Sequence, residues 1–385
     1  MFRIFNFFLL LIFFSIPLSA KDNSIILERE GNELIIHYTI SKAKEIRVDE
    51  HYKNLLVKDK TFTKSEEGKF RVTLNIKSEV SKDFYDPIRV YSNGDFLLYK
   101  DFLFPERIRY DKSVFLDKKK DGFPKFSIQE RKNYIIGDRF VLWGDKEPIK
   151  ILGLEKNQAL KDNILQVYKR IFNYYSDNFG ALFKRKPIVI IDFTEDGGEF
   201  DYKGDALDNF LSCNISNLSK LDKKKYYNMY MFISHEIFHI WNSYEHNHRG
   251  KAWLHEGSAE YFSMMSLLDL NYMEKNKVES LKKIYLDTCL DYYKKNNTIM
   301  NNNNSENSVY MCGASLHILL EKLESREIVL DIWKELLKKD KYNSDDFFEI
   351  INNHSAISKG RASSIYDFIY KEGGVVQAIE DLKLK

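Results

Sequence analysis

Short segments of alternating apolar and polar residues follow one another from residue 21 to about residue 145, for example LIIHYTI and KFRVTLNI. This alternation, rich in β-branched residues, is typical of strands that bury one face. The dipeptide Asn93-Gly94 lies between two apolar runs in VYSNGDFLLY, which predicts a hairpin with a two-residue turn. NYIIGDRFVLWG (133–144) predicts a further pair of strands that ends the region. We therefore predict an antiparallel β-domain of sandwich type over residues 21–145.

The pattern changes to a helical period after residue 146. Apolar residues recur at helical spacing in QALKDNILQVYKRIFNYYSDNFG, and Gly180 ends this predicted helix. PIVIIDF (187–193) predicts a buried strand, and almost all of the chain after residue 222 has a helical pattern. The Asn-rich stretch at 296–307 has no apolar periodicity and is predicted to be a surface loop. These patterns favour an α+β protein in which residues 146–385 form a mixed, then mostly helical, domain.

The first twenty residues, MFRIFNFFLLLIFFSIPLSA, differ from the rest of the chain. Arg3 precedes a long apolar run, and small residues follow it up to Ala20, as in a secretory signal peptide that is cleaved near Ala20. We expect an exported protein, periplasmic or secreted. The alternative is an uncleaved N-terminal anchor, although the run is short for a full membrane span. No other segment is apolar enough to cross a bilayer, so we expect no stable span beyond the signal segment.

Charge and cysteine content exclude some functions. The 59 basic and 57 acidic residues nearly cancel to a net charge of +2, and no basic half stands out, so nucleic acid is not an expected partner. The chain has 3 cysteines, which allow at most one disulfide and do not form a thiolate metal site. Any metal must therefore be held by histidine and carboxylate. Cys312 is expected to be a small core residue.

The segment HEIFH (235–239) carries the candidate chemistry. Residues four apart lie on one face of an α-helix, so His235 and His239 can direct two imidazoles at one metal ion. Glu236 lies about 100° round the helix, from where it can reach a water on that metal without being a ligand. A catalytic zinc needs three protein ligands and an open position, so a third ligand must come from elsewhere.

AWLHEGSAEYFS (252–263) supplies that third ligand. Glu256 follows His239 by seventeen positions, which leaves room for a loop and the start of a second helix. Glu260 shares a helix face with Glu256, and its carboxylate could accept the free N–H of a ligand histidine and fix its tautomer. Three further histidines are expected to be solvated in loops: His246, His248 and His255.

These motifs resemble the gluzincin metallopeptidases. HEIFHIWN with WLHEGSAEYF is most similar to the glycyl aminopeptidase family, and next to the family of membrane alanyl aminopeptidase and leukotriene hydrolase. The resemblance implies a thermolysin-like catalytic domain and one zinc ion on His235, His239 and Glu256. It also implies that Glu236 is the general base. SVYMCGASLHILLEKL (308–323) resembles the families' Y-x-x-G-A segment, which implies that Tyr310 hydrogen-bonds the tetrahedral intermediate.

A further resemblance concerns the substrate. In the alanyl aminopeptidases, the glutamate of a G-A-M-E-N segment holds the substrate's α-ammonium group. GDALDNFLS (204–212) resembles that segment, with Asp208 in the place of the glutamate. We therefore predict peptide-bond hydrolysis, by an aminopeptidase that acts on short peptides. The alternatives are an endopeptidase on the same scaffold, with peptide or protein substrates, and a non-catalytic binding protein whose zinc is structural.

Overall fold

The computed structural model describes the strands between residues 24 and 144 together with Tyr91, and most of the chain from residue 149 onward. In that second part it describes residues 149–154, 161–180, 187–195, 197–207, 210–220, 222–242, 251–302, 305–339 and 341–383. The predicted signal segment, residues 1–20, lies outside the described residues. The chain divides into two compact units, Met1–Arg139 and Phe140–Lys385.

The first unit contains two sheets. One has the strand order β3-β4-β2-β1-β7, and its pairs are antiparallel except for the parallel pair of β1 and β7. The prediction of an entirely antiparallel domain was therefore wrong at this pair, because a parallel partner comes from far along the chain and leaves no local pattern. The strands are β1 (Ser24–Glu30), β2 (Glu33–Thr39), β3 (Thr63–Glu66), β4 (Lys69–Asn75) and β7 (Lys112–Asp117).

The second sheet of this unit is antiparallel throughout, in the order β5-β6-β9-β8. Its first two strands flank the Asn93-Gly94 dipeptide and are antiparallel, which confirms the predicted hairpin. The predicted two-residue turn was wrong, because it would place Val90 opposite Leu97, whereas Val90 pairs with Phe96. The strands are β5 (Ile88–Val90), β6 (Phe96–Tyr99), β8 (Ser127–Gln129) and β9 (Asn133–Ile136).

The second unit begins with a five-stranded mixed sheet in the order β10-β11-β12-β14-β13. β12 pairs in parallel with β11 and β14, and its buried run matches the strand predicted from PIVIIDF. Both strands predicted within 133–144 are present, but β10 pairs with β11 and not with β9, so their expected pairing with each other was wrong. β13 lies at an edge of the sheet, antiparallel to β14. The strands are β10 (Phe140–Gly144), β11 (Lys150–Leu154), β12 (Ile188–Thr194), β13 (Asp201–Leu207) and β14 (Phe210–Ser216).

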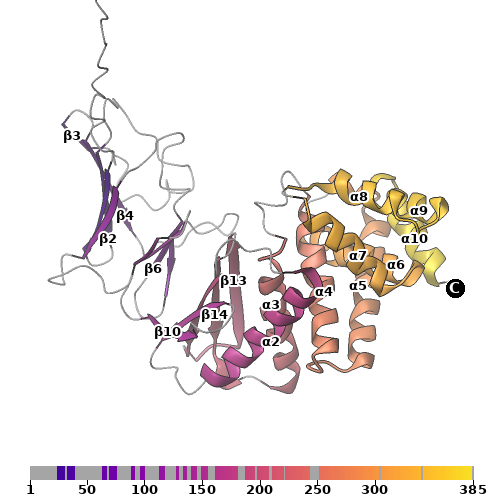
Figure 1. The fold of residues 1–385 in the computed structure, drawn as a ribbon, viewed down its shortest axis with the longest axis horizontal. Coiled ribbons are helices and arrows are strands. Elements are labelled where there is room, and N and C mark those ends of the chain that lie inside the picture. Colours follow the sequence, from indigo (N-terminus) through magenta and orange to yellow (C-terminus); the bar gives the residue numbers. More distant parts are fainter. Residues whose placement is uncertain are drawn as a thin grey trace, which may run out of the picture. The chain divides into compact units, whose positions relative to one another are not determined.

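Helices make up most of the remainder of this unit, as the sequence predicted (Figure 1). α2 (Lys161–Phe179) buries its apolar face and ends at Gly180, whose φ of 80° suits glycine at a helix C-terminus. The longer helices that follow are α3 (Lys223–Phe238), α4 (Ala252–Asp269) and α5 (Lys275–Lys295). The C-terminal helices are α6 (Gly313–Leu323), α7 (Arg326–Leu337), α8 (Ser344–Asn353), α9 (Lys359–Tyr370) and α10 (Gly374–Lys383).

Among the residues described in this unit there are also three short helices: η3 (Leu218–Lys220), η4 (Met300–Asn302) and the π-helix η5 (Asn307–Cys312). η4 lies within the Asn-rich stretch, where Met300 is fully buried, so the predicted surface loop is anchored in the core at this point. One apolar core links the sheet to the helices and includes Trp241, Trp253 and Trp333. Among the described helices, none has the length and apolar character needed to cross a membrane.

Candidate metal and catalytic site

Two packed helices supply the candidate metal ligands. His235 lies in the last turn of α3, and His239 directly follows that helix, with its N–H still bonded to the carbonyl of His235 at 3.3 Å. Glu256 lies near the start of α4, which packs against α3. All three side chains are at least nine-tenths buried. The helical spacing of the histidines and the contact between the helices therefore bring together the three residues that the sequence analysis selected.

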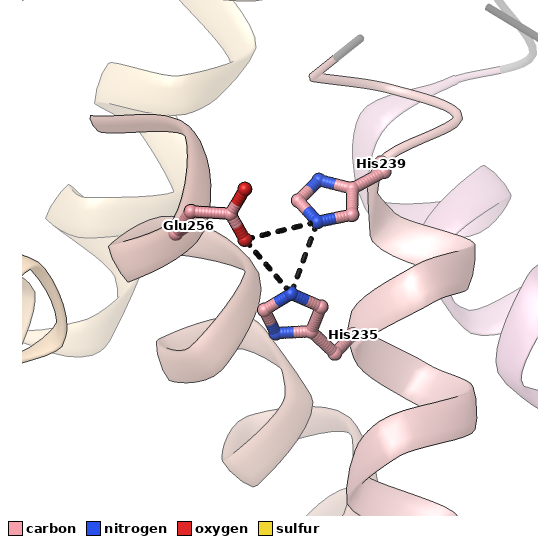
Figure 2. A group of neighbouring side chains, drawn as sticks. All are labelled: His235, His239 and Glu256. Carbon is pink, nitrogen blue, oxygen red and sulfur yellow. Dashed lines mark hydrogen bonds and ion pairs between the residues drawn. The ribbon is translucent and has the colours of Figure 1, made fainter. Parts of the chain in front are cut away.

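The three ligand atoms form a compact triangle (Figure 2). The Nε2 atoms of His235 and His239 are 3.0 Å apart, and Oε2 of Glu256 lies 3.1 Å from the first and 3.3 Å from the second. Zinc bonds of about 2.0–2.1 Å in a tetrahedral arrangement separate neighbouring ligand atoms by about 3.3 Å. The triangle is close to that size, so its dimensions fit one zinc ion.

A hydrogen bond fixes the tautomer of His239. Its Nδ1 lies 2.9 Å from Oδ1 of Asn242, whose amide nitrogen donates to the carbonyl of His255 and to Oγ of Ser258. Because those two bonds use the donor side of the amide, Oδ1 must accept and Nδ1 must carry the proton. In neutral His239 the lone pair is then on Nε2, which faces the triangle. Asn242 was missed by the sequence analysis, although it lies three residues after His239, at helical spacing.

Glu260 fixes the tautomer of His235, as Asn242 does for His239. Its Oε1 lies 3.1 Å from Nδ1 of His235, as the sequence analysis predicted, and its Oε2 accepts a hydrogen bond of 2.5 Å from Tyr285. Burial raises the pKa of Glu260, but the hydrogen bond with His235 and its charge outweigh that effect, so the pKa is lowered overall. An ionised Glu260 keeps the proton of neutral His235 on Nδ1. Tyr285 lies on α5 and was not predicted.

The donor set therefore fits a cation. With both Nδ1 atoms protonated, two imidazole lone pairs and a carboxylate oxygen converge on one point. Burial raises the pKa of Glu256, but the two histidines outweigh it and hold that pKa well below its usual value. Burial lowers the pKa of His235, but Glu256 and Glu260 outweigh it and raise that pKa well above its usual value. Without a metal, a proton on His235 holds the triangle together, so a metal ion must displace that proton.

His255 is not a solvated loop histidine, so that prediction was wrong. It lies within α4 and is buried, and its ring stacks on His239 with centroids 4.1 Å apart. Its Nδ1 donates to the carbonyl of Asn242 at 2.8 Å. Burial and the nearby His239 lower the pKa of His255 to about 3, so it is neutral at pH 7. His246 and His248 lie outside the described residues.

Glu236, His235 and Tyr310 line one cavity. The volume of this cavity is about 510 Å³. The edge strand β13 contacts α3 and comes very close to this carboxylate at Gly204. A Cβ atom at Gly204 would lie 2.6 Å from both Cδ and Oε1 of Glu236. Any larger residue at this position would therefore force the Glu236 carboxylate to move. Asp208 directly follows β13 but lies outside the described residues, so its predicted role stays a prediction.

Tyr310 lies on η5, and its ring is roughly parallel to that of His235 with centroids 6.0 Å apart. Single-turn π-helices are frequent at functional sites. Cys312 is fully buried in the core, as predicted, and it also forms a disulfide with Cys289 of α5, which was not predicted. Gly313 directly follows η5 and contacts Gly257 of α4. A Cβ atom added to either glycine would lie less than 3 Å from backbone atoms of the other segment. The sequence motifs around Glu256 and Tyr310 thus meet at a pair of glycines.

Comparisons with known proteins agree with this architecture. No protein-family model matches the chain, and no curated protein does. Among solved structures, the chain is similar to an aminopeptidase N family protein from Idiomarina loihiensis, with a TM-score of 0.59 and 14% sequence identity. The match covers 91% of this chain and 76% of that protein. At this identity the similarity shows a shared fold.

Proposed function

We propose that the protein is an exported zinc metallopeptidase that hydrolyses peptide bonds, and that it acts as an aminopeptidase on short peptides. The observation that carries this proposal is the convergence of two imidazole lone pairs and one carboxylate oxygen, with one of the imidazoles, that of His235, lining a cavity that Glu236 also lines. Three protein ligands with an open fourth position are typical of catalytic zinc sites, whereas structural sites are closed by four.

A zinc ion held by these ligands would supply Lewis-acid chemistry, which polarises a carbonyl and acidifies a water molecule. Glu236 accepts the proton of the attacking water and delivers it to the leaving amine. Tyr310 donates its phenolic hydrogen to the oxygen that becomes negative as the water attacks. Glu260 and Asn242 hold His235 and His239 in the tautomers that bind a cation.

Two features support the aminopeptidase specificity and the export of the protein. A carboxylate at Asp208, directly after the edge strand, could pair with a cationic substrate N-terminus, and this favours an aminopeptidase over an endopeptidase. The disulfide between Cys289 and Cys312 fits an oxidising compartment, as expected after export. A purely structural zinc would need no Glu236, and this argues against the non-catalytic alternative.

The proposal is tested by metal analysis together with peptide hydrolysis. We expect about one zinc per chain, and Glu256→Ala should lose most of it because one of three ligands is removed. Glu236→Gln should keep the zinc while hydrolysis falls by at least about 100-fold, since the amide cannot take a proton. Zinc-loaded wild-type protein that cleaves no member of a peptide library would contradict the proposal.

A second assay separates the two kinds of peptidase. An aminopeptidase should cleave peptides with a free N-terminus and spare their acetylated versions, and Asp208→Asn should remove most of that preference while the zinc stays. Equal cleavage of free and acetylated peptides by the wild type would favour the endopeptidase.

Export is tested by sequencing the N-terminus of the mature protein, which should begin at Lys21.

A further inference from the structure

The cavity that holds the candidate catalytic residues continues beyond them between α3 and α5. On the α3 side it is lined by Tyr227 and Met231, and on the α5 side by Leu281 and Ile284. Residues at this spacing lie on one face of each helix. The side chain of Ile284 is large and apolar, yet Ile284 is 52% exposed. An apolar wall of this kind suits a bulky apolar substrate side chain.

Lys277 lines the same cavity and differs in character from this wall. Among the described lining residues it is the only lysine or arginine, and it is half-buried. No ion pair joins Lys277 to any acidic group in the described parts of the chain, and the first turn of α5 carries no acidic side chain. The acidic lining residues are Glu236 and Glu260, both of which belong to the metal end.

The position of Lys277 determines how far from the reacting bond a substrate group must lie to meet its ammonium group. Lys277 precedes Tyr285, the partner of Glu260, by eight residues on α5, which corresponds to about 12 Å along the helix. An extended peptide advances about 3.3 Å per residue, and a lysine side chain reaches several ångströms to either side. The ammonium group can therefore meet a group that lies about two to four residues from the reacting bond.

We propose, on the basis of the proposed function, that Lys277 binds a carboxylate of the substrate and so makes the enzyme selective for peptides that carry one at this distance. An apolar side chain next to the reacting bond then contacts Met231, Leu281 and Ile284. A carboxylate placed nearer the metal would be repelled by Glu236 and Glu260, so the charges favour one direction of binding. The carboxylate is either the C-terminus of a short peptide or an acidic side chain.

Three peptides distinguish these two sources: Ala-Phe-Ala with a free C-terminus, the same peptide as its C-terminal amide, and Ala-Phe-Glu as its amide. Zinc-loaded full-length protein should cleave the first with a kcat/KM about 10-fold above that of the second, since a partly buried ion pair is worth about one decade in binding. The third should match the first if a side-chain carboxylate serves as well, and match the second if the C-terminus is required. Higher ionic strength should shrink the preference.

The decisive variant is Lys277→Met, which keeps the length of the side chain and removes its charge. The ratio between the first two peptides should fall to about one, mainly through KM. Lys275→Met is the matched control, because Lys275 is exposed, begins the same helix and does not line the cavity. That variant should keep the ratio.

An unchanged ratio in Lys277→Met, or equal cleavage of all three peptides by the wild type, would overturn this inference and leave the proposed function intact. Absence of cleavage of every peptide would instead contradict the proposed function, and the inference with it.

Discussion

Gly204 of the edge strand β13 lies against the carboxylate of Glu236. We expect Gly204→Ala to lower kcat by at least about 10-fold, because a Cβ 2.6 Å from the carboxylate must displace it from its working position. The added Cβ would also lie 2.8 Å from the Phe232 ring, which must shift as well, so the free energy of unfolding should fall by about 1–3 kcal/mol. Steady-state kinetics and urea denaturation of the same preparation measure both quantities.

Gly197 provides the control, since nothing lies within 4 Å of a Cβ built there, although its φ of 84° disfavours alanine. Gly197→Ala should therefore lower stability without a comparable loss of kcat. If Gly204→Ala retained full turnover, the close contact would have no influence on Glu236.

At the scale of single residues, local spacing predicted a large part of the candidate site. His235, His239, Glu256 and Glu260 lie at helical intervals within two short segments, and the helical period alone places them on common faces. Tyr285 could not be found in this way, because it reaches Glu260 from a different helix. The burial of His255 was missed for a related reason, since it depends on how α4 packs against the end of α3.

The contact between Gly257 and Gly313 lies at the scale of whole elements, because it sets how closely α4 and the η5–α6 segment approach. A Cβ at Gly257 would lie 2.2–2.3 Å from backbone atoms of Gly313, which cannot move aside as a side chain can. We expect Gly257→Ala to cost about 1–3 kcal/mol of unfolding free energy, measured by denaturant titration.

The matched control is Gly360→Ala in α9, where the added Cβ meets nothing within 4 Å. That substitution should stabilise the protein by about 0.5–1 kcal/mol, because alanine is the better helix former. Equal effects of the two substitutions would show that the contact between the elements is not tight.

Individual elements were predicted better than their pairing. α2 and the buried strand β12 follow from periodicity within one segment. The parallel pair of β1 and β7 and the pairing of β10 with β11 join segments whose relation is decided by the packing of the whole sheet. The disulfide between Cys289 and Cys312 belongs to the same class, because three cysteines allow three pairings and the sequence does not distinguish them.

His317 affects the pH dependence of the whole molecule. It is fully buried, donates from Nδ1 to the carbonyl of Gly313 and accepts from Trp333 at Nε2, and burial lowers its pKa to about 4. The unfolded chain, with an ordinary histidine pKa of about 6.5, binds this proton more readily. Stability from His317 is thus fully present above pH 6.5 and is lost as the pH falls toward 4. Between pH 7 and pH 5 the loss should be about 2 kcal/mol.

Urea denaturation at several pH values measures this slope. His317→Gln keeps an acceptor for Trp333 but cannot be protonated, so its unfolding free energy should depend less steeply on pH, whatever its absolute stability. Parallel slopes for the variant and the wild type would exclude His317 as a source of the dependence. His255, whose pKa burial lowers to about 3, contributes to the slope in both proteins.

The disulfide between Cys289 and Cys312 spans 23 positions and encloses Tyr310. Closing a loop of this length stabilises a protein by about 3 kcal/mol in the chain-entropy model. We expect the Cys289→Ala/Cys312→Ala variant to lose stability of that order and to lose part of its kcat, because η5 is no longer tied to α5. Its zinc content should stay the same, since neither cysteine is one of the three candidate zinc ligands. Thermal unfolding, kinetics and metal analysis test these three points.

This cross-link has a consequence for anyone who produces the protein. In the cytoplasm of a bacterial expression strain, thiols stay reduced, and the recombinant protein would be purified without the disulfide that ties the segment of Tyr310 to α5. Under the proposed function, such a preparation would bind as much zinc as the native protein and would pass as native by metal analysis, yet its specific activity would be too low. Material from an oxidising host and from a reducing host should therefore differ in turnover while their metal content agrees.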